Sequence, residues 1–159
     1  MGGRWTEIVK RVCLETWAKY GMTVEQTKTK CTNFGDTAEE PVLGVVIDAA
    51  KRERRLPQSK VRKYSDNVDE IIQAAEDHPK NLVDKQSVQQ ILGRMLFALK
   101  AGVTTLRGDF MLILSMLSGH WSRKWMQFSS EAVDLLRHMQ WRLHNENSCA
   151  LTPYRARPG

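Results

Sequence analysis

The sequence predicts a predominantly helical α+β fold: a helix and a strand, then one β-hairpin, then a bundle of about four helices. Three observations lead to this prediction. Apolar residues recur at helical spacing in several separate segments. Only one stretch, residues 42–57, combines a β-branched run with turn residues and a closing proline, which is typical of a hairpin. The 159 residues are enough for one domain or two small subdomains with a sizeable core.

The first predicted helix spans residues 5–20. Its apolar residues lie on one side and most of its charged residues on the other. Gly21 ends the helix as a C-terminal cap. We expect Trp5 and Trp17 to pack in the core rather than to offer a stacking surface for nucleic-acid bases.

Two less regular segments precede the hairpin. Residues 22–24 and 27–31 are predicted to be extended or strand-like. Residues 33–41 are predicted to form a polar loop that contains several acids. Because loop carboxylates are usually solvated, we do not interpret these acids as a metal site.

The predicted hairpin has one apolar arm and one basic arm. Residues 42–47 form the apolar arm, which breaks at Asp48, and charged residues lead from there to Pro57. Seven of the thirteen residues 51–63 are basic, against the single acid Glu53: Lys51, Arg52, Arg54, Arg55, Lys60, Arg62 and Lys63. We expect the apolar arm to pack inward and the basic arm to be able to face a polyanion.

Two helices should follow the hairpin. The first spans residues 58–77 and begins with basic residues, which the helix dipole disfavours; either a phosphate backbone or screening at the surface would offset this. Asp84 should cap the second, which runs to about residue 101. Gly93 inside this helix suggests that another backbone approaches closely.

Two more helices complete the predicted bundle. One opens at Arg107 and is apolar nearly all round, so it should be central or covered by a partner. The last is capped by Ser129 or Ser130 and ends at Asn145. Between them lies an aromatic cluster that either stacks on bases or forms a hydrophobic junction, of which we favour the junction: Trp121, Trp125, Met126 and Phe128.

Composition limits the possible partners. The net charge of +6 favours a polyanion, of which nucleic acid is the first candidate. Three widely spaced cysteines argue for a reducing, intracellular compartment, and their spacing to the histidines is not that of a zinc site. The longest apolar run, residues 110–114, is too short to span a membrane, so no membrane partner is expected.

Three segments together carry a family resemblance. They are Leu43-Gly44-Val45-Val46-Ile47-Asp48, Leu56-Pro57 followed by Lys60, and the helical segment 91–98, Ile-Leu-Gly-Arg-Met-Leu-Phe-Ala. They resemble the end of the palm and the thumb of retroelement reverse transcriptases, particularly the tyrosine-recombinase and long-terminal-repeat types. The resemblance extends over roughly residues 5–145.

The resemblance implies a division of the chain into five parts. These are a palm remnant at 1–41, a primer-grip-like hairpin at 42–57, thumb-like helices at 58–101, connection-like helices at 102–145 and an irregular tail at 146–159. A retroelement product would be found in the cytoplasm or nucleus, and an organelle is left open.

The implied function is non-catalytic binding of an RNA–DNA or RNA primer-template. Candidate nucleic-acid-binding residues are Leu43, Gly44, Lys51, Arg52, Arg54, Arg55, Lys60, Arg62, Lys63 and Arg94. Polymerases of this family hold Mg²⁺ with clustered carboxylates that include a Tyr-x-Asp-Asp-like turn, and this sequence has no such turn. We therefore predict no catalytic residue and no cofactor in this chain, with Mg²⁺ relevant only if a complete palm is supplied.

Two other hypotheses remain. In the first, the chain is a structural subunit of a larger protein or ribonucleoprotein complex, repurposed from a retroelement. Its protein partner would then contact the apolar residues Phe110, Leu114, Trp121 and Trp125. The other hypothesis keeps RNA-directed DNA polymerase activity, with the palm provided by a second chain.

Overall fold

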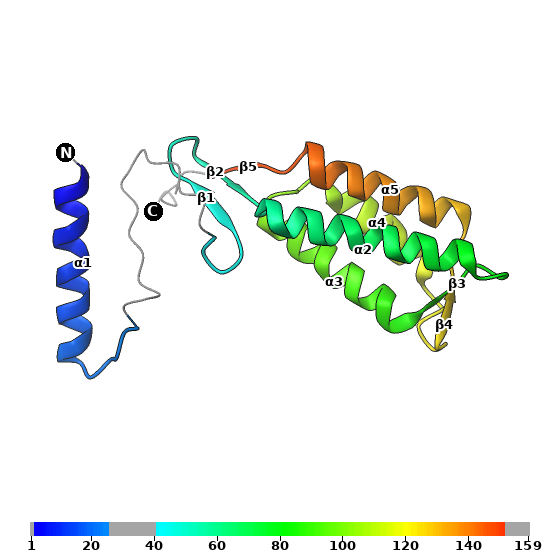
Figure 1. The fold of residues 1–159 in the computed structure, drawn as a ribbon, viewed down its shortest axis with the longest axis horizontal. Helices are drawn as coiled ribbons and strands as arrows, with labels where there is room; N and C mark the ends of the chain where they lie inside the picture. The colour runs from blue at the N-terminus through cyan, green and yellow to red at the C-terminus, as the bar shows by residue number, and fades with distance from the viewer. Residues whose placement is uncertain (1, 26–40, 152–159) are drawn as a thin grey trace, which may run out of the picture.

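The computed structural model describes residues 2–25 and 41–151, and it confirms the predominantly helical α+β class. Within these residues there are five helices and five short strands (Figure 1). In chain order they are α1 (Gly2–Lys19), β1 (Val46–Asp48), β2 (Glu53–Arg55), α2 (Gln58–Asp77), β3 (Leu82–Asp84), α3 (Lys85–Ala101), α4 (Leu106–Leu117), β4 (Trp125–Gln127), α5 (Ser130–Asn145) and β5 (Cys149–Ala150).

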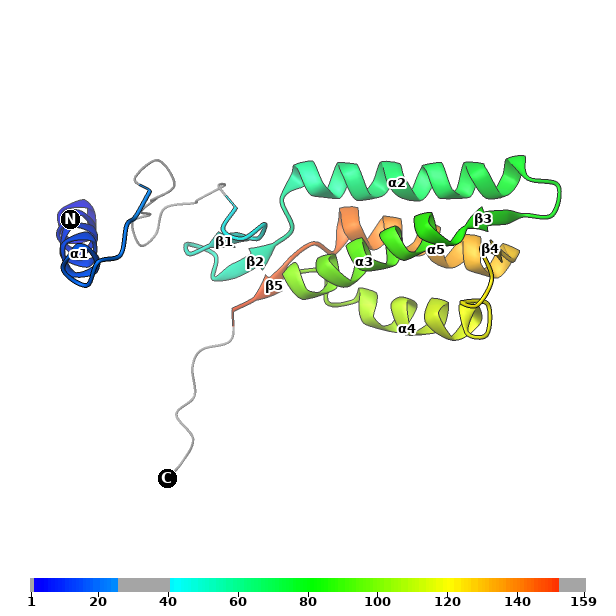
Figure 2. The same cartoon turned by 90° about the horizontal axis from the view of Figure 1, so that it is seen from below.

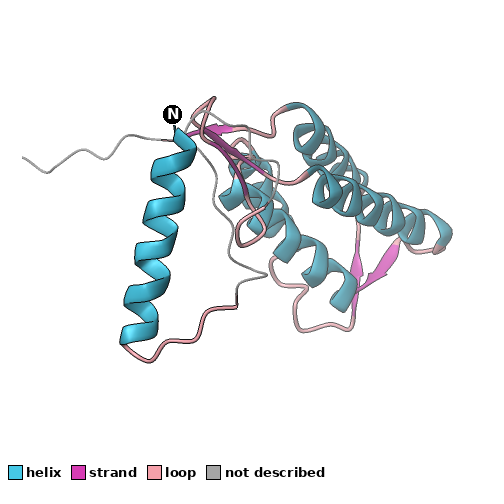
Figure 3. Cartoon of the chain, turned by 60° about the vertical axis from the view of Figure 1, so that its left-hand side comes forward, coloured by secondary structure: helices cyan, strands magenta, loops and turns pink. Residues whose placement is uncertain are grey.

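Helix α1 stands apart from the helical bundle (Figures 1 and 3). The side chains of Trp5 and Trp17 are 71% and 44% exposed, so the prediction that they pack in the core is wrong. Gly21 follows the helix with φ +78°, as a C-terminal cap requires. Residues 22–24 belong to no strand, while 27–31 and 33–40 of the predicted segments lie outside the described residues.

The four helices α2 to α5 form the bundle that holds the core. Helices α3 and α5 lie between α2 and α4, and each packs against both (Figure 2). The apolar residues that recur at helical spacing along α2 are all buried: Val61, Tyr64, Val68, Ile71, Ile72 and Ala75. The most deeply buried side chains come from all four helices and include Val61, Ile91, Met95, Ile113, Leu136 and Met139.

Two predicted caps fix where α3 and α5 begin. The Asp84 carboxylate accepts a hydrogen bond from the Ser87 N–H at 3.4 Å, and the Ser129 hydroxyl accepts one from the Ala132 N–H at 3.3 Å. Each satisfies a backbone donor that has no partner within its own helix.

The hairpin is part of a three-stranded antiparallel sheet in the order β1-β2-β5. In its register, Val46 pairs with Arg55, and Arg54 pairs with Cys149. The prediction that the tail past residue 145 is irregular is therefore wrong for Cys149 and Ala150. The tail returns to the hairpin and covers the outer edge of β2.

A second antiparallel pair, β3 and β4, was not predicted, and it lies at the opposite end of the bundle from the hairpin (Figure 1). Met126 and Phe128 are buried there, at 0% and 2% exposure, and Trp121 packs against the core. This arrangement agrees with the junction interpretation of the aromatic cluster. Trp125 remains 48% exposed.

The close backbone approach expected at Gly93 occurs at Gly102 instead. A Cβ built at Gly93 would meet nothing within 4 Å, so that expectation is wrong. At Gly102 a Cβ would lie 2.8 Å from the Arg55 Cα and 2.9 Å from the Arg54 carbonyl oxygen. The absence of a side chain at Gly102 therefore lets strand β2 lie directly against the end of α3.

Candidate nucleic-acid interface

Asp48 organises the turn of the hairpin. It is the last residue of β1 and is fully buried. Its carboxylate accepts a hydrogen bond from the Lys51 N–H at 3.0 Å and pairs with the Arg55 guanidinium at 3.1 Å. The Lys51 N–H, and to a lesser degree Arg55, hold the pKa of Asp48 below its usual value against the opposing effect of burial. The turn is thus fixed by a buried, ionised carboxylate.

The alternation of strand β2 divides the basic arm between two faces. Arg55 lies on the face of Asp48 and is engaged in its ion pair. Arg54 lies on the other face, opposite Ile47 and Cys149. Its Nε is buried and has no hydrogen-bond partner among the described residues. The whole arm therefore does not face one polyanion, because Arg55 is held within the hairpin.

The loop between β1 and β2 carries the exposed charges of the hairpin. Lys51 and Arg52 are both exposed. Arg52 has φ +53°, and its carbonyl accepts a hydrogen bond from the Leu151 N–H at 2.8 Å. The returning tail thereby holds the loop in place.

Leu43 and Gly44 form a tight turn ahead of β1 rather than part of a strand. Val42 and Val45 exchange two backbone hydrogen bonds, of 2.8 and 3.0 Å. The two residues between them have φ +52° and +82°, which is the pattern of a type I′ turn. The Leu43 side chain is 94% exposed at the tip. The predicted apolar arm 42–47 therefore folds as a turn followed by a short strand.

Lys60 joins this turn to the bundle. Its Nζ lies 4.3 Å from the centre of the Phe97 ring, a cation–π contact between α2 and α3. A Cβ at Gly44 would overlap the Lys60 Nζ and would lie 3.1 Å from the Phe97 Cζ. Leu43, Gly44 and Lys60, which were predicted separately, thus lie side by side.

A groove of about 480 Å³ runs between α2 and α3 and brings three more of the predicted residues together. Arg62 and Lys63 of α2 and Arg94 of α3 line it, and Arg94 also lies 5.9 Å from the centre of the Tyr64 ring. Burial raises the pKa of Tyr64, and the positive charge of Arg94 partly opposes this. The other lining residues are Ser59, Asp66, Asn67, Glu70 and Gln90.

Sequence reasoning missed the uncharged part of this site. Asn67 and Gln90 were not singled out, although Asn67 is a polar residue on the inward side of α2. Among the predicted site residues only Arg55 pairs with a carboxylate of the described chain within 4.0 Å. Arg62, Lys63 and Arg94, which line the groove, have no carboxylate partner among the described residues.

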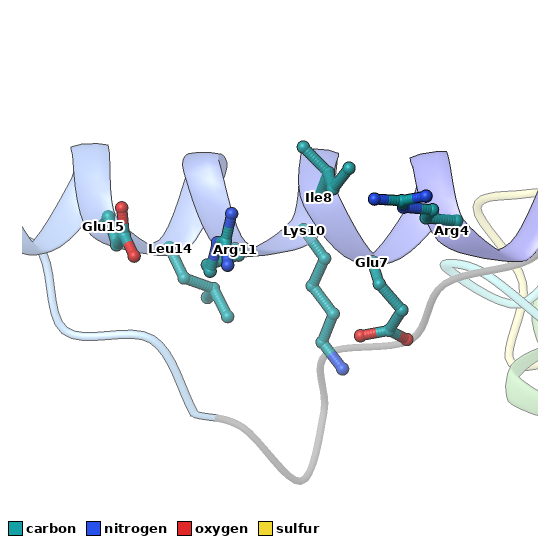
Figure 4. A pocket seen from close by; sticks show the side chains of 7 residues that line it. All are labelled: Arg4, Glu7, Ile8, Lys10, Arg11, Leu14 and Glu15. Carbon is teal, nitrogen blue, oxygen red and sulfur yellow. The ribbon is translucent and has the colours of Figure 1, made fainter.

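A second hollow, of about 620 Å³, lies along α1 and was not predicted. Charged residues of both signs line it, among them Arg4, Glu7, Lys10 and Arg11 (Figure 4). All of the lining residues, Ile8 and Leu14 included, belong to a single helix whose charged side chains are spaced as on a solvated helix face. We assign no chemistry to it.

Most of the residues predicted to contact a protein partner pack against other residues of this chain instead. Phe110, Leu114 and Trp121 pack against the core of the bundle, which leaves Trp125 as the exposed member of the set. Other exposed apolar side chains lie elsewhere: Trp5, Val9, Val12 and Trp17 on α1, and Met111 and Leu112 on α4.

The described residues contain neither a metal-binding cluster nor a membrane-spanning helix. In residues 2–25 and 41–151, no three His, Cys, Asp or Glu side chains gather as a metal-binding group. No helix in that part of the chain combines the length and the apolar character needed to cross a membrane.

Comparison with protein-family models, with curated proteins and with solved structures found no match for this chain. The resemblance to reverse transcriptases therefore stays a prediction.

Proposed function

We propose that this chain binds nucleic acid along the α2–α3 groove and the adjoining hairpin, as a reverse-transcriptase-like fragment without the catalytic carboxylates. The observation that carries the proposal is the position of Lys60. It contacts the Gly44 turn and the Phe97 ring, and it lies on α2 next to the groove lined by Arg62, Lys63 and Arg94. Lys60 thus links the Gly44 turn to the helix that carries the groove cations Arg62 and Lys63.

The charges on this track suit phosphates. Lys and Arg contacts to a phosphate backbone release counterions and contribute affinity without reading sequence. Arg62 and Lys63 are exposed, and neither has a carboxylate partner among the described residues. Two acids, Asp66 and Glu70, also line the groove, so phosphates are expected nearer to its basic end.

The start of helix α2 supports the same assignment. Its first turn contains no acidic residue, and Pro57 provides no side-chain cap. The helix dipole places partial positive charge at this end, beside Lys60, Arg62 and Lys63. A bound phosphate would be stabilised by both, as anions are at helix N-termini.

Catalysis is not part of the proposal. Phosphoryl transfer by polymerases needs metal ions held by clustered carboxylates. The chain would hold a primer-template, and Mg²⁺ would become relevant only if a complete palm were supplied by another chain.

The exposed apolar face of α1 favours a second candidate function, a structural subunit of a larger complex. Trp5 and Tyr20 are 71% and 75% exposed, and Val9 and Val12 lie between them on the same side at 57% and 51%. Contiguous apolar surface of this kind is typical of protein contacts. In this alternative the charged groove is a solvated surface.

Binding of a fluorescent RNA–DNA primer-template by the purified chain, measured across a salt series, tests the proposal. We expect affinity to fall steeply as salt rises. Absence of binding at low salt would contradict the proposal and favour the structural alternative.

A further inference from the structure

The apolar face of α1 is open along the whole helix. The helix stands apart from the bundle, and the side chains of Trp5, Val9 and Val12 are each more than half exposed (Figures 1 and 3). Thr16, one helical turn beyond Val12, is exposed as well. An amphipathic helix normally covers its apolar stripe against another element, so this stripe calls for a second molecule.

The stripe has the spacing of a coiled-coil seam. Trp5, Val9, Val12 and Thr16 follow one another at intervals of four, three and four residues. Alternating intervals of three and four keep successive side chains on one line along a helix, and this line faces a second helix in coiled coils. Ile8 lies beside the seam and widens the apolar contact. The occupant that fits this face is therefore another helix.

The four seam positions are symmetric about the midpoint between Lys10 and Arg11. A second copy of α1 in antiparallel orientation would therefore bring Trp5 opposite Thr16 of the second copy, and Val9 opposite its Val12. Each large indole would then meet a small side chain, which lets the layers interdigitate. A parallel copy would instead place the two indoles directly opposite each other. The sizes of the seam residues thus favour the antiparallel orientation.

Two charges beside the seam favour the same orientation. Arg4 and Glu15 are three helical turns apart and so lie on one flank of α1, where both are exposed and neither forms an ion pair among the described residues. Antiparallel pairing about the midpoint brings Glu15 to within about 3 Å, along the helix axis, of Arg4 of the second copy. In a parallel pair this axial separation would be about 16 Å.

We propose that α1 pairs with α1 of a second copy in antiparallel orientation, so that the chain forms a two-fold symmetric dimer. A second copy is the occupant because the face complements itself in both size and charge, as an isologous interface requires. The seam is short, so monomer and dimer should exchange with concentration. This inference goes beyond the proposed nucleic-acid binding and does not depend on it.

Light scattering after size-exclusion chromatography, over a concentration series without nucleic acid, tests the dimer. We expect the mass of the wild-type chain to rise from 18.2 kDa toward twice that value. By symmetry, Val9→Asp places a carboxylate in both Val9–Val12 layers, so this variant should keep the mass of one chain at every concentration. Because Val9 is exposed and α1 lies outside the bundle, the substitution should leave the bundle folded.

The matched control is Ala18→Asp, which adds the same side chain at an exposed position on the opposite face of α1. It should dimerise as the wild-type chain does.

Exchange of the two flanking charges tests the orientation. Arg4→Glu alone and Glu15→Arg alone should each weaken the dimer about fivefold, because each removes two ion pairs and leaves like charges facing each other. The double variant should restore wild-type dimerisation.

Each result either supports or overturns a part of the proposal. A wild-type chain that keeps the mass of one chain at every concentration would overturn the dimer and leave the face of α1 to a different protein. Dimerisation that survives Val9→Asp would overturn the role of α1. Single charge variants without effect, or a double variant without rescue, would overturn the antiparallel orientation.

Discussion

The side-chain amide of Asn147 forms two hydrogen bonds with the backbone of Leu56. It accepts from the Leu56 N–H at 2.8 Å and donates to the Leu56 carbonyl at 2.8 Å. Leu56 is 1% exposed and connects β2 to α2, so these backbone groups have no ready access to water. Asn147, two residues after the end of α5, thus holds the junction between the hairpin and the bundle, where the proposed interface lies.

Replacing Asn147 by alanine should leave both Leu56 backbone groups without partners. Because a buried unpaired polar group costs 1–3 kcal/mol, we expect Asn147→Ala to lower the free energy of unfolding by about 2 kcal/mol or more. Urea unfolding measures this change. Ser148→Ala, at an exposed neighbouring position, is the control and should change little. Equal effects of the two substitutions would contradict the stabilising role of the two hydrogen bonds between Asn147 and Leu56.

Gly102 and Gly93 should respond to alanine in opposite directions. At Gly102 the new Cβ would overlap the backbone of Arg54 and Arg55, so we expect a loss of about 1–3 kcal/mol. At Gly93, within α3, the Cβ meets nothing within 4 Å, and higher helix propensity should add up to about 1 kcal/mol. Thermal unfolding of both variants checks the pair. Stabilisation by Gly102→Ala would show that β2 does not lie against α3 in this way.

The substitution Leu43→Asn should raise the stability of the chain and weaken its binding of a primer-template. The left-handed conformation at φ +52° costs a leucine about 1–2 kcal/mol, whereas Asn-Gly is the preferred pair for such a turn. We expect the variant to be more stable by about 1 kcal/mol. We also expect weaker primer-template binding, because the 94% exposed side chain no longer offers apolar surface to a base. Unchanged affinity would remove Leu43 from the interface.

Asp48 should make the stability of the hairpin depend on pH. Its folded-state pKa is lowered by the Lys51 N–H and Arg55, so its contribution is fully present above its unfolded value, about 4, and is lost as the pH falls through the lowered folded value. We expect Asp48→Asn to have a lower Tm than wild type at pH 7 and a smaller difference near pH 2.

The control for this prediction is Asp134→Asn, an exposed carboxylate on α5. It should leave the pH dependence of Tm unchanged. A constant difference between Asp48→Asn and wild type from pH 7 to pH 2 would show that ionised Asp48 is not what stabilises the turn.

Helices α2, α3 and α5 could be predicted almost to the residue because their patterns are long and their ends are marked. Pro57 precedes α2, and Asp84 and Ser129 cap the other two. The strands β3, β4 and β5 could not be predicted, because two or three residues carry too little pattern. Their pairing is set by the helices that bring them together.

The candidate site was predictable only in its charges. The sequence shows many cations in residues 51–63, but it does not show that Arg55 pairs with Asp48 or that Arg94 reaches the groove of α2. Gly93 and Gly102 are a second example. In the sequence, either glycine is compatible with the close approach of another backbone, and only the three-dimensional packing determines that it occurs at Gly102. Asn67 was missed because the sequence does not show that it lines the groove.

The salt dependence of binding gives the sharpest test of the proposed interface. Arg55 is unsuitable for mutation because its loss would remove the ion-pair partner of the buried Asp48. The test variant is therefore Arg62→Glu with Lys63→Glu, at two exposed residues that line the groove. The control is Arg123→Glu with Lys124→Glu, the same charge change at the exposed β3–β4 end of the bundle (Figure 1).

The measured quantity is the slope of log affinity against log salt concentration for an RNA–DNA primer-template. Each phosphate contact contributes about 0.7–0.9 to this slope, so we predict that the groove variant binds more weakly, with a slope shallower by roughly 1.5, while the control keeps the wild-type slope. No binding by the wild-type chain, or equal losses in the two variants, would contradict a nucleic-acid interface between α2 and α3.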